Sequence, residues 1–140
     1  MPRHMSFSLT QRQLLDGTKD VTRRLGWERL RPGEELIACE KCMGLKQGES
    51  PRQLAVIRVL SVRREPLEMI DQYDVVREGF PALTPSGFVE MFTRHMGCEP
   101  TTIITRIEFK ILKALNPDEP PERRKRRRRE SVRQGIFAFQ

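Results

Sequence analysis

Long apolar runs, cysteine pairs and aromatic residues are all scarce in this sequence. No stretch approaches the roughly 18 consecutive apolar residues of a membrane-spanning helix, and the N-terminal segment MPRHMSFSL lacks the apolar centre of a secretory signal. The three cysteines cannot all pair within the chain, which argues against a scaffold held together by disulfides. We therefore expect a soluble, cytoplasmic protein that does not associate with membranes.

Negative charge is scarce towards the C-terminal end. Residues 113–140 hold nine Lys/Arg and only four Asp/Glu, a net charge of +5, whereas the preceding residues hold 17 basic and 15 acidic groups. This segment contains seven consecutive basic residues at 123–129 and has too little apolar content to fold alone. We expect a folded domain over 1–112 and a flexible basic tail over 113–140. The tail would bind RNA electrostatically, with Arg126 and Arg127 among its phosphate contacts.

Hydrophobic patterning in the first 112 residues alternates between strand and helix signals. The longest β signal, QLAVIRVLSVRREPL, predicts a central strand. The predicted elements are strands at 5–10, 21–27, 36–40, 53–67 and 101–112 and helices at 10–17, 69–80 and 83–97. Several short strands with two or three short helices between them favour an α+β fold, built on a small mixed β-barrel rather than a parallel α/β sheet.

Capping residues define two of the predicted helices. Thr84 is the expected N-cap of the longest helix, and Gly97 is its expected end. Thr10 followed three residues later by Gln13 has the pattern of a capping box at the start of the first helix.

Alternation predicts which strand residues are buried. Phe7 and Leu9 are two apart in the first strand and should share a buried face. In the last strand, Ile107 and Phe109 should face the core, and Arg106 should lie on the opposite polar face.

The segment DGTKDVTRR, residues 16–24, is the densest group of reactive side chains. If the part after Asp20 is extended, Thr22 and Arg24 lie on one face of a strand, and Lys19 can lean over them from the preceding turn. A partly desolvated lysine beside an arginine should have a lowered pKa and could accept a proton. The alternative is a solvated polar turn with no chemical role.

The same segment resembles the G-x-K-x-x-T-x-R pattern that opens the ASCH domain (activating-signal-cointegrator homology), a branch of the PUA-like superfamily. Gly17, Lys19, Thr22 and Arg24 stand at the four positions of the pattern. The similarity continues in order through VIRVLSVRREPL, REGFPALTPSGFVEMF and ITRIEF, and covers roughly residues 5–112. The resemblance implies a PUA-like pseudo-barrel with a cleft lined by the first motif.

The resemblance also implies RNA-related activity. One small bacterial branch hydrolyses the amide of acetylated cytidine with a lysine, a threonine and a glutamate, which correspond here to Lys19, Thr22 and Glu78. Lys19 would be the base, Thr22 the nucleophile or water holder and Glu78 the proton shuttle, while Arg24 would stabilise the oxyanion or bind a phosphate. The loop at 43–53 and the basic tail depart from that branch.

Three alternatives remain for the cleft. It can bind RNA or a flipped-out nucleotide without catalysis, it can cleave single-stranded RNA without a metal, or it can be vestigial in a protein-interaction adaptor. The candidate contacts for a nucleotide are the rings of Trp27, Tyr73 and Phe80 and the arginines Arg23, Arg24 and Arg64. A lone tryptophan is more often a packing residue than a stacking platform.

Four residues have the types and local spacings of a tetrahedral zinc site. They are Cys39, Cys42, His95 and Cys98. The opposing interpretation is that Cys39 is a small buried residue of a strand and that His95 belongs to a helix face. We expect no catalytic metal and no cofactor, because the sequence has no acidic cluster suited to a two-metal mechanism.

Overall fold

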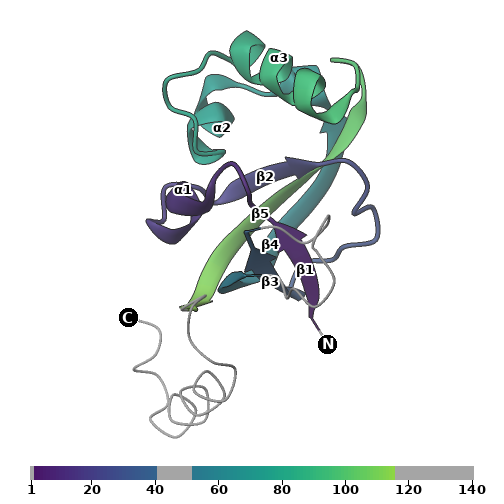
Figure 1. The fold of residues 1–140 in the computed structure, drawn as a ribbon. Helices are drawn as coiled ribbons and strands as arrows, with labels where there is room; N and C mark the ends of the chain where they lie inside the picture. Colours follow the sequence, from purple (N-terminus) through teal and green to yellow (C-terminus); the bar gives the residue numbers. More distant parts are fainter. Residues whose placement is uncertain (1, 41–51, 116–140) are drawn as a thin grey trace, which may run out of the picture.

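The computed structural model describes residues 2–40 and 52–115. These residues form a five-stranded sheet with the order β1-β3-β4-β5-β2, in which β1 and β3 are parallel and the other neighbouring strands are antiparallel (Figure 1). The strands are β1 (Arg3–Ser6), β2 (Val21–Arg24), β3 (Glu35–Cys39), β4 (Gln53–Pro66) and β5 (Ile103–Ala114). The helices are α1 (Gln11–Leu15), α2 (Gln72–Arg77) and α3 (Pro85–Met96), with one 3-10 turn at Leu67–Met69.

The long strands β4 and β5 form the middle of the sheet. β4 pairs with β3 on one side and β5 on the other, which confirms the prediction of a central strand. Two register shifts, between Val56 and Ile57 and between Val59 and Ser61, interrupt the pairing of β4 with β5. Each shift leaves an extra residue in one strand, which bends the pair. The sheet is therefore a curved half-barrel, and the predicted α+β fold built on a small mixed barrel is confirmed.

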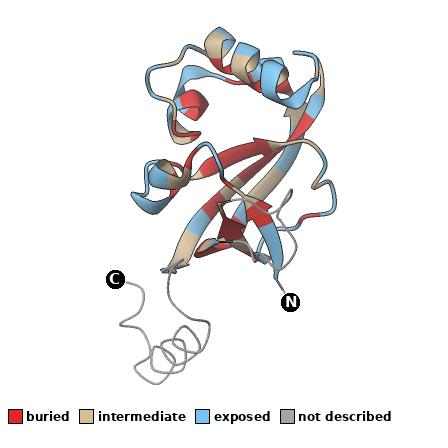
Figure 2. Cartoon of the chain, in the orientation of Figure 1, coloured by how far each residue is buried: buried red, intermediate tan, exposed pale blue. Residues whose placement is uncertain are grey.

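The apolar residues form two clusters. The sheet core lies among β1, α1 and the central strands and includes Met5, Phe7, Leu14, Leu36, Ile57, Ile107 and Phe109. The helical core joins the 3-10 turn, α2, α3 and the start of β5 and consists of Leu67, Ile70, Val75, Phe88, Phe92 and Ile104. Buried residues lie both on the strands and in the region of α2 and α3 (Figure 2).

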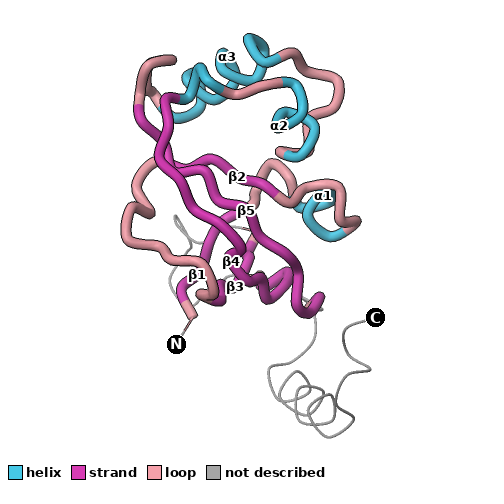
Figure 3. The backbone as a smooth tube through the Cα atoms, turned by 180° about the vertical axis from the view of Figure 1, so that it is seen from behind, coloured by secondary structure: helices cyan, strands magenta, loops and turns pink. Residues whose placement is uncertain are grey.

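The helices of the described ranges are short, and none of them is long and apolar enough to span a membrane. Figure 3, from behind, shows α2 and α3 together at one end of the sheet and α1 beside β2. The predicted limits of α3 are confirmed, because Thr84 accepts a hydrogen bond from the backbone N–H of Gly87 at 3.0 Å, and Gly97 adopts a left-handed conformation that ends the helix.

Three local predictions are wrong. β1 ends at Ser6, so Leu9 lies outside the strand and is 59% exposed, although Phe7 is buried. The side chain of Thr10 makes no capping hydrogen bond, and Gln13 instead donates to the carbonyl of Gly79. Arg106 is buried rather than solvated, because it packs beneath α2, where it finds a carboxylate.

Candidate functional site

A cavity of about 310 Å³ lies between the two apolar clusters. Its walls come from the segment after β1, from β2, from the end of α2 and from α3. The polar wall is formed by Lys19, Thr22, Arg23, Arg24 and Glu78, and the opposite side is formed mainly by Phe80, Phe88, Met91, Phe92 and His95. The structure thus brings together the residues of the DGTKDVTRR segment and Glu78.

Lys19 is positioned by the turn that follows α1. Gly17 has a φ of +83°, a conformation that suits glycine, and the backbone N–H of Lys19 then donates to the carbonyl of Gln13 at 3.0 Å. The Lys19 Nζ lies 2.9 Å from Glu78 Oε1 and 2.8 Å from the Glu78 carbonyl oxygen. Both residues are almost completely buried, with 4% and 3% of their surface exposed. Residues 59 positions apart therefore form one buried pair.

Burial lowers the pKa of Lys19, because the ammonium form loses its hydration. The charge and hydrogen bond of Glu78 oppose this effect, whereas the positive charges of Arg24 and Arg23 add to it, and the pKa remains below the ordinary value. The Lys19 Nζ donates both of these hydrogen bonds to Glu78, while its pKa lies below that of an ordinary lysine. Lys19 is thus suited to accept a proton.

Thr22 and Arg24 occupy alternate positions of β2, as predicted. The Nε of Arg24 donates to Thr22 Oγ1 at 3.0 Å, and the guanidinium carbon lies 4.7 Å from the centre of the Phe7 ring. Thr22 is buried, and its hydroxyl proton is not used by the bond from Arg24. A hydroxyl and a guanidinium therefore stand together on the polar wall.

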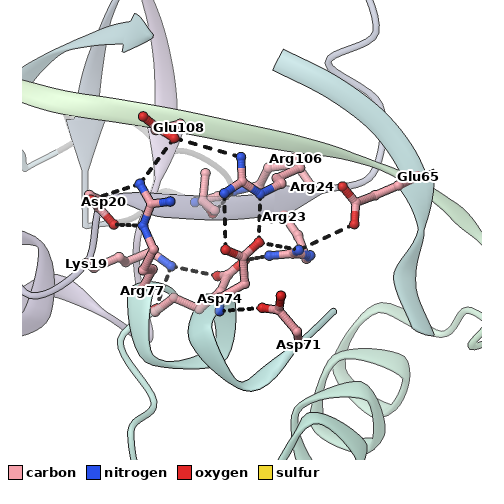
Figure 4. Close-up of polar contacts among 12 residues, drawn as sticks. Lys19, Asp20, Arg23, Arg24, Glu65, Asp71, Asp74, Arg77, Arg106 and Glu108 are labelled. Atoms are coloured by element: carbon pink, nitrogen blue, oxygen red, sulfur yellow. Dashed lines mark hydrogen bonds and ion pairs between the residues drawn. The ribbon is translucent and has the colours of Figure 1, made fainter. Parts of the chain in front are cut away.

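Arg23 joins Glu78 to Asp74. Figure 4 shows Arg23 beside Asp74, with Arg106 on the other side of this carboxylate. Its Nη1 lies 3.3 Å from Glu78 Oε2, and its Nη2 lies 2.6 Å from Asp74 Oδ2 and 3.5 Å from Glu65 Oε2. Arg106 binds both carboxylate oxygens of Asp74, at 2.7 and 3.1 Å. The guanidinium of Arg23 is thus committed to protein carboxylates, which argues against the predicted contact between this group and an RNA phosphate.

The carboxylate of Asp74 is held ionised. Burial alone would raise its pKa, but the hydrogen bonds and charges of Arg106 and Arg23 outweigh burial and hold the pKa well below the usual range. At the edge of the same network, Arg77 binds both oxygens of Asp20 at 2.9 and 3.1 Å and Glu108 at 3.2 Å. These pairs connect α2 to β5 and to Asp20, the residue directly before β2.

Aromatic rings form the wall opposite the charged residues. The ring centres of Phe80 and Phe88 are 5.9 Å apart, and those of Phe88 and Phe92 are 6.1 Å apart. His95 lies one helical turn beyond Met91 on α3, borders the cavity and is exposed, so it stands at the rim. One side of the cavity can therefore hold a flat apolar ring and the other can bind polar groups.

Three residues that the sequence predicts as nucleotide contacts do not line the cavity. Arg64 is exposed on β4, where it donates to Thr105 Oγ1 at 2.7 Å and pairs with Glu28 at 3.1 Å. Trp27, at a φ of +54°, packs against the sheet core beneath Arg3, and Tyr73 is 69% exposed on α2. None of these three residues lines the cavity. The predicted tail contacts Arg126 and Arg127 lie outside the described residues.

The proposed zinc ligands are divided between two regions. Cys39 is buried at the end of β3, and Cys98 packs against the helical core. His95 borders the cavity, and Cys42 lies outside the described residues. Within 2–40 and 52–115, no group of three or more His, Cys, Asp or Glu side chains could hold a metal ion.

Asp74 and Arg106, which bind each other, are not among the candidate site residues predicted from the sequence. Asp74 also binds Arg23. Asp74 carries a recoverable signal, since it lies four residues before Glu78 and therefore on the same side of a helix. Arg106 carries none, because alternation groups it with the polar residues of β5. Its burial depends on α2, which covers that position.

The sequence matches no protein-family model and no curated protein.

Several solved structures have a fold similar to that of this protein. Protein EF3133 from Enterococcus faecalis V583, described under family DUF984, aligns with a TM-score of 0.61 at 16% identity over 83% of each chain. The hypothetical protein PH0355 aligns with a TM-score of 0.56 at 18% identity over 79% of this chain and 99% of its own. The ASCH domain from Lactobacillus crispatus JV V101 aligns with a TM-score of 0.55 at 15% identity over 78% of each chain. The chain therefore has the fold of an ASCH domain.

Proposed function

We propose that the protein binds a modified nucleoside, either free or unstacked from RNA, in the cavity and hydrolyses the amide of acetylated cytidine there. The observation that carries this proposal is the buried contact of 2.9 Å between Lys19 Nζ and Glu78 Oε1 on the wall of a cavity. A buried lysine and carboxylate that face a cavity are typical of sites for proton transfer.

The dimensions of the cavity support a ligand of nucleoside size. Its volume of about 310 Å³ lies at the lower end of the range for pockets that bind small molecules. A cavity of this size has room for one nucleobase and its sugar but not for a stretch of stacked RNA. The rings of Phe80, Phe88 and Phe92 supply an apolar wall for the base.

The polar wall supplies the groups that amide hydrolysis needs. Neutral Lys19 takes a proton from the Thr22 hydroxyl or from a water molecule, and the resulting oxygen nucleophile attacks the acetyl carbonyl carbon. Arg24 stabilises the negative charge that develops on the carbonyl oxygen. The proton passes from Lys19 through Glu78 to the leaving N4 nitrogen as the C–N bond breaks. Hydrolysis by water gives acetate and cytidine, directly or through an acetyl ester on Thr22.

The test is turnover of N4-acetylcytidine by the full-length protein, followed by chromatography of the cytidine produced. Lys19→Met, Thr22→Val and Glu78→Gln preserve the approximate side-chain volumes and should each lower kcat/KM by about 100-fold or more. Lys110→Met and Glu90→Gln are matched controls on exposed positions and should leave the rate unchanged. Thermal unfolding identifies any variant that has lost its fold.

Single-stranded RNA is assayed in parallel with the same variants. Binding of nucleoside or RNA without turnover would leave a recognition module and would refute hydrolysis. Cleavage of RNA chains in the presence of a chelator would indicate a metal-independent ribonuclease instead. If neither ligand binds, the cavity has no role in nucleoside recognition, and an interaction adaptor becomes the better hypothesis.

A further inference from the structure

β2 lies at one edge of the described sheet and pairs only with β5. In an antiparallel pair, residues alternate between those whose backbone groups bond to the neighbour and those whose groups point away from it. The N–H of Phe109 donates to the carbonyl of Asp20 at 3.0 Å, which fixes this alternation. Two and four residues further along, Thr22 and Arg24 therefore bond to β5, and the N–H and C=O of Arg23 point towards the open edge.

The cavity borders β2. Thr22, Arg23 and Arg24 all line it, although consecutive side chains of a strand alternate between its two faces. Arg23 lines the cavity although its side chain is only 1% exposed, so the cavity contacts this residue mainly through its main chain. The backbone donor and acceptor of Arg23 therefore face the cavity, and no other described residue bonds to them.

The side chain of Arg23 is closed off from the cavity. Its Nη1 and Nη2 bind Glu78 and Asp74, but its Nε is buried and has no hydrogen-bond partner among the described residues. The whole residue is 4% exposed. The side chain alone is only 1% exposed, so the surface that Arg23 offers to the cavity belongs mainly to its main chain.

We infer that Arg23 recognises the ligand through its main chain: its N–H and C=O pair with an adjacent acceptor and N–H on the edge of a planar ring. This inference rests on the proposed function and specifies the class of ligand. In cytosine the adjacent groups are the ring nitrogen N3 and the exocyclic N4–H, and acetylation of N4 leaves one hydrogen there. A strand edge binds an added backbone in the same way, through alternating donors and acceptors.

The inference sets a specificity rule. A nucleoside without a hydrogen on N4 leaves the carbonyl of Arg23 buried without a partner, which lowers affinity. N4-methylcytidine keeps one such hydrogen and N4,N4-dimethylcytidine has none, so these two probes differ in the hydrogen and in one methyl group. We expect the dimethyl compound to bind at least about tenfold more weakly to the full-length protein by calorimetry.

Amide hydrogen exchange separates the effect of the missing hydrogen bond from the bulk of the extra methyl group. With N4-methylcytidine bound, the exchange of the Arg23 amide should slow by about tenfold or more, because the amide gains an acceptor. The Thr22 amide already faces β5 and is the internal control, so its exchange should change little.

The outcomes distinguish this inference from the proposed function. If N4-acetylcytidine is hydrolysed but both probes bind within twofold of each other and the Arg23 amide exchange is unchanged, the inference is wrong and the proposed function stands. If no nucleoside binds at all, both are wrong. Weaker binding of the dimethyl compound together with slower exchange at Arg23 supports the inference.

Discussion

Arg106 binds both carboxylate oxygens of Asp74, with its Nε 2.7 Å from Oδ2 and its Nη2 3.1 Å from Oδ1. The two residues come from β5 and α2, so the pair attaches the helical region to the sheet. The Nη2 of Arg23, on β2, lies 2.6 Å from the same Oδ2. The Nη1 of Arg23 lies 3.3 Å from Glu78 Oε2. The position of Glu78 beside Lys19 therefore depends on a buried ionic network.

Replacement of Asp74 by Asn should destabilise the protein. Asn keeps the shape of the side chain but removes the charge that faces Arg23 and Arg106, and breaking one member of a buried ion pair costs about 3 kcal/mol or more. Urea unfolding measures the change. Glu90→Gln, in an exposed pair with Arg94, is the control and should change stability by less than about 0.5 kcal/mol. Equal stabilities of the two variants would contradict a structural role of the network.

Acid should weaken the same network. Because the pKa of Asp74 in the folded state is lowered, the unfolded state binds more protons in the acid range, and its contribution to stability is present at neutral pH. That contribution should decline as the pH falls below about 4, the ordinary pKa of an aspartate. Urea midpoints at successive pH values should fall more steeply for the unmodified protein than for Asp74→Asn. Parallel curves would show that Asp74 does not carry the effect.

Gly79 should be sensitive to substitution because of its position beside Lys19. It has a φ of +99°, and a Cβ there would lie 3.1 Å from Gln13 Cβ and 3.6 Å from Lys19 Cβ. Gly33 has a φ of +93° with no atom within 4 Å of such a Cβ, so Gly33→Ala has similar backbone strain without the contact. Both alanine variants should lose about 1–2 kcal/mol of stability. Only Gly79→Ala should lower the hydrolysis of N4-acetylcytidine, by about tenfold or more, because the added Cβ displaces Gln13, whose carbonyl accepts the backbone N–H of Lys19. Equal rates in the two variants would refute this expectation.

The pH dependence of hydrolysis should follow Lys19. A base acts only when deprotonated, so kcat/KM should rise with pH and level off above a pKa that lies below the ordinary lysine value of about 10.4. Arg24 contributes to the lowered pKa of Lys19, so Arg24→Gln should move the midpoint of the profile to higher pH, whatever its effect on the maximal rate. Arg94→Gln, on the exposed face of α3, should leave the midpoint in place. A midpoint that stays fixed or falls in Arg24→Gln would exclude Lys19 as the titrating group.

Local signals in the sequence predict much of this fold. The run of β-branched residues in β4 identifies the central strand, and Thr84 and Gly97 define α3 because their roles depend only on the backbone nearby. Local signals alone do not predict the candidate site. Lys19 and Glu78 are 59 positions apart, and only the resemblance of DGTKDVTRR to a known motif places them together before the structure does.

What local patterns miss are the consequences of tertiary contacts. Alternation correctly separates Arg106 from Ile107, but it cannot show that α2 covers the polar face and buries the guanidinium against Asp74. Trp27 adopts a positive φ that few bulky residues tolerate, and it packs on the sheet core instead of facing the cavity. Each difference arises where a distant element determines the environment of a residue.

The basic segment after the sheet should contribute to RNA affinity but not to hydrolysis of a free nucleoside. The truncation is placed after Leu115, since β5 runs to Ala114 and the Leu115 N–H donates to the Leu54 carbonyl at 2.8 Å. Removal of residues 116–140 deletes eight Lys/Arg, so binding of single-stranded RNA should weaken. The slope of log K against log salt should become shallower by about 0.7 for each phosphate that the shortened protein no longer neutralises. Fluorescence anisotropy between about 50 and 200 mM salt measures both quantities.

The full-length double variant Arg126→Gln and Arg127→Gln should show a smaller decrease in affinity than the truncated protein. Unchanged affinity of the truncated protein at low salt would refute a role of the tail in binding RNA, and slower hydrolysis of N4-acetylcytidine would show that the tail contributes to the cavity.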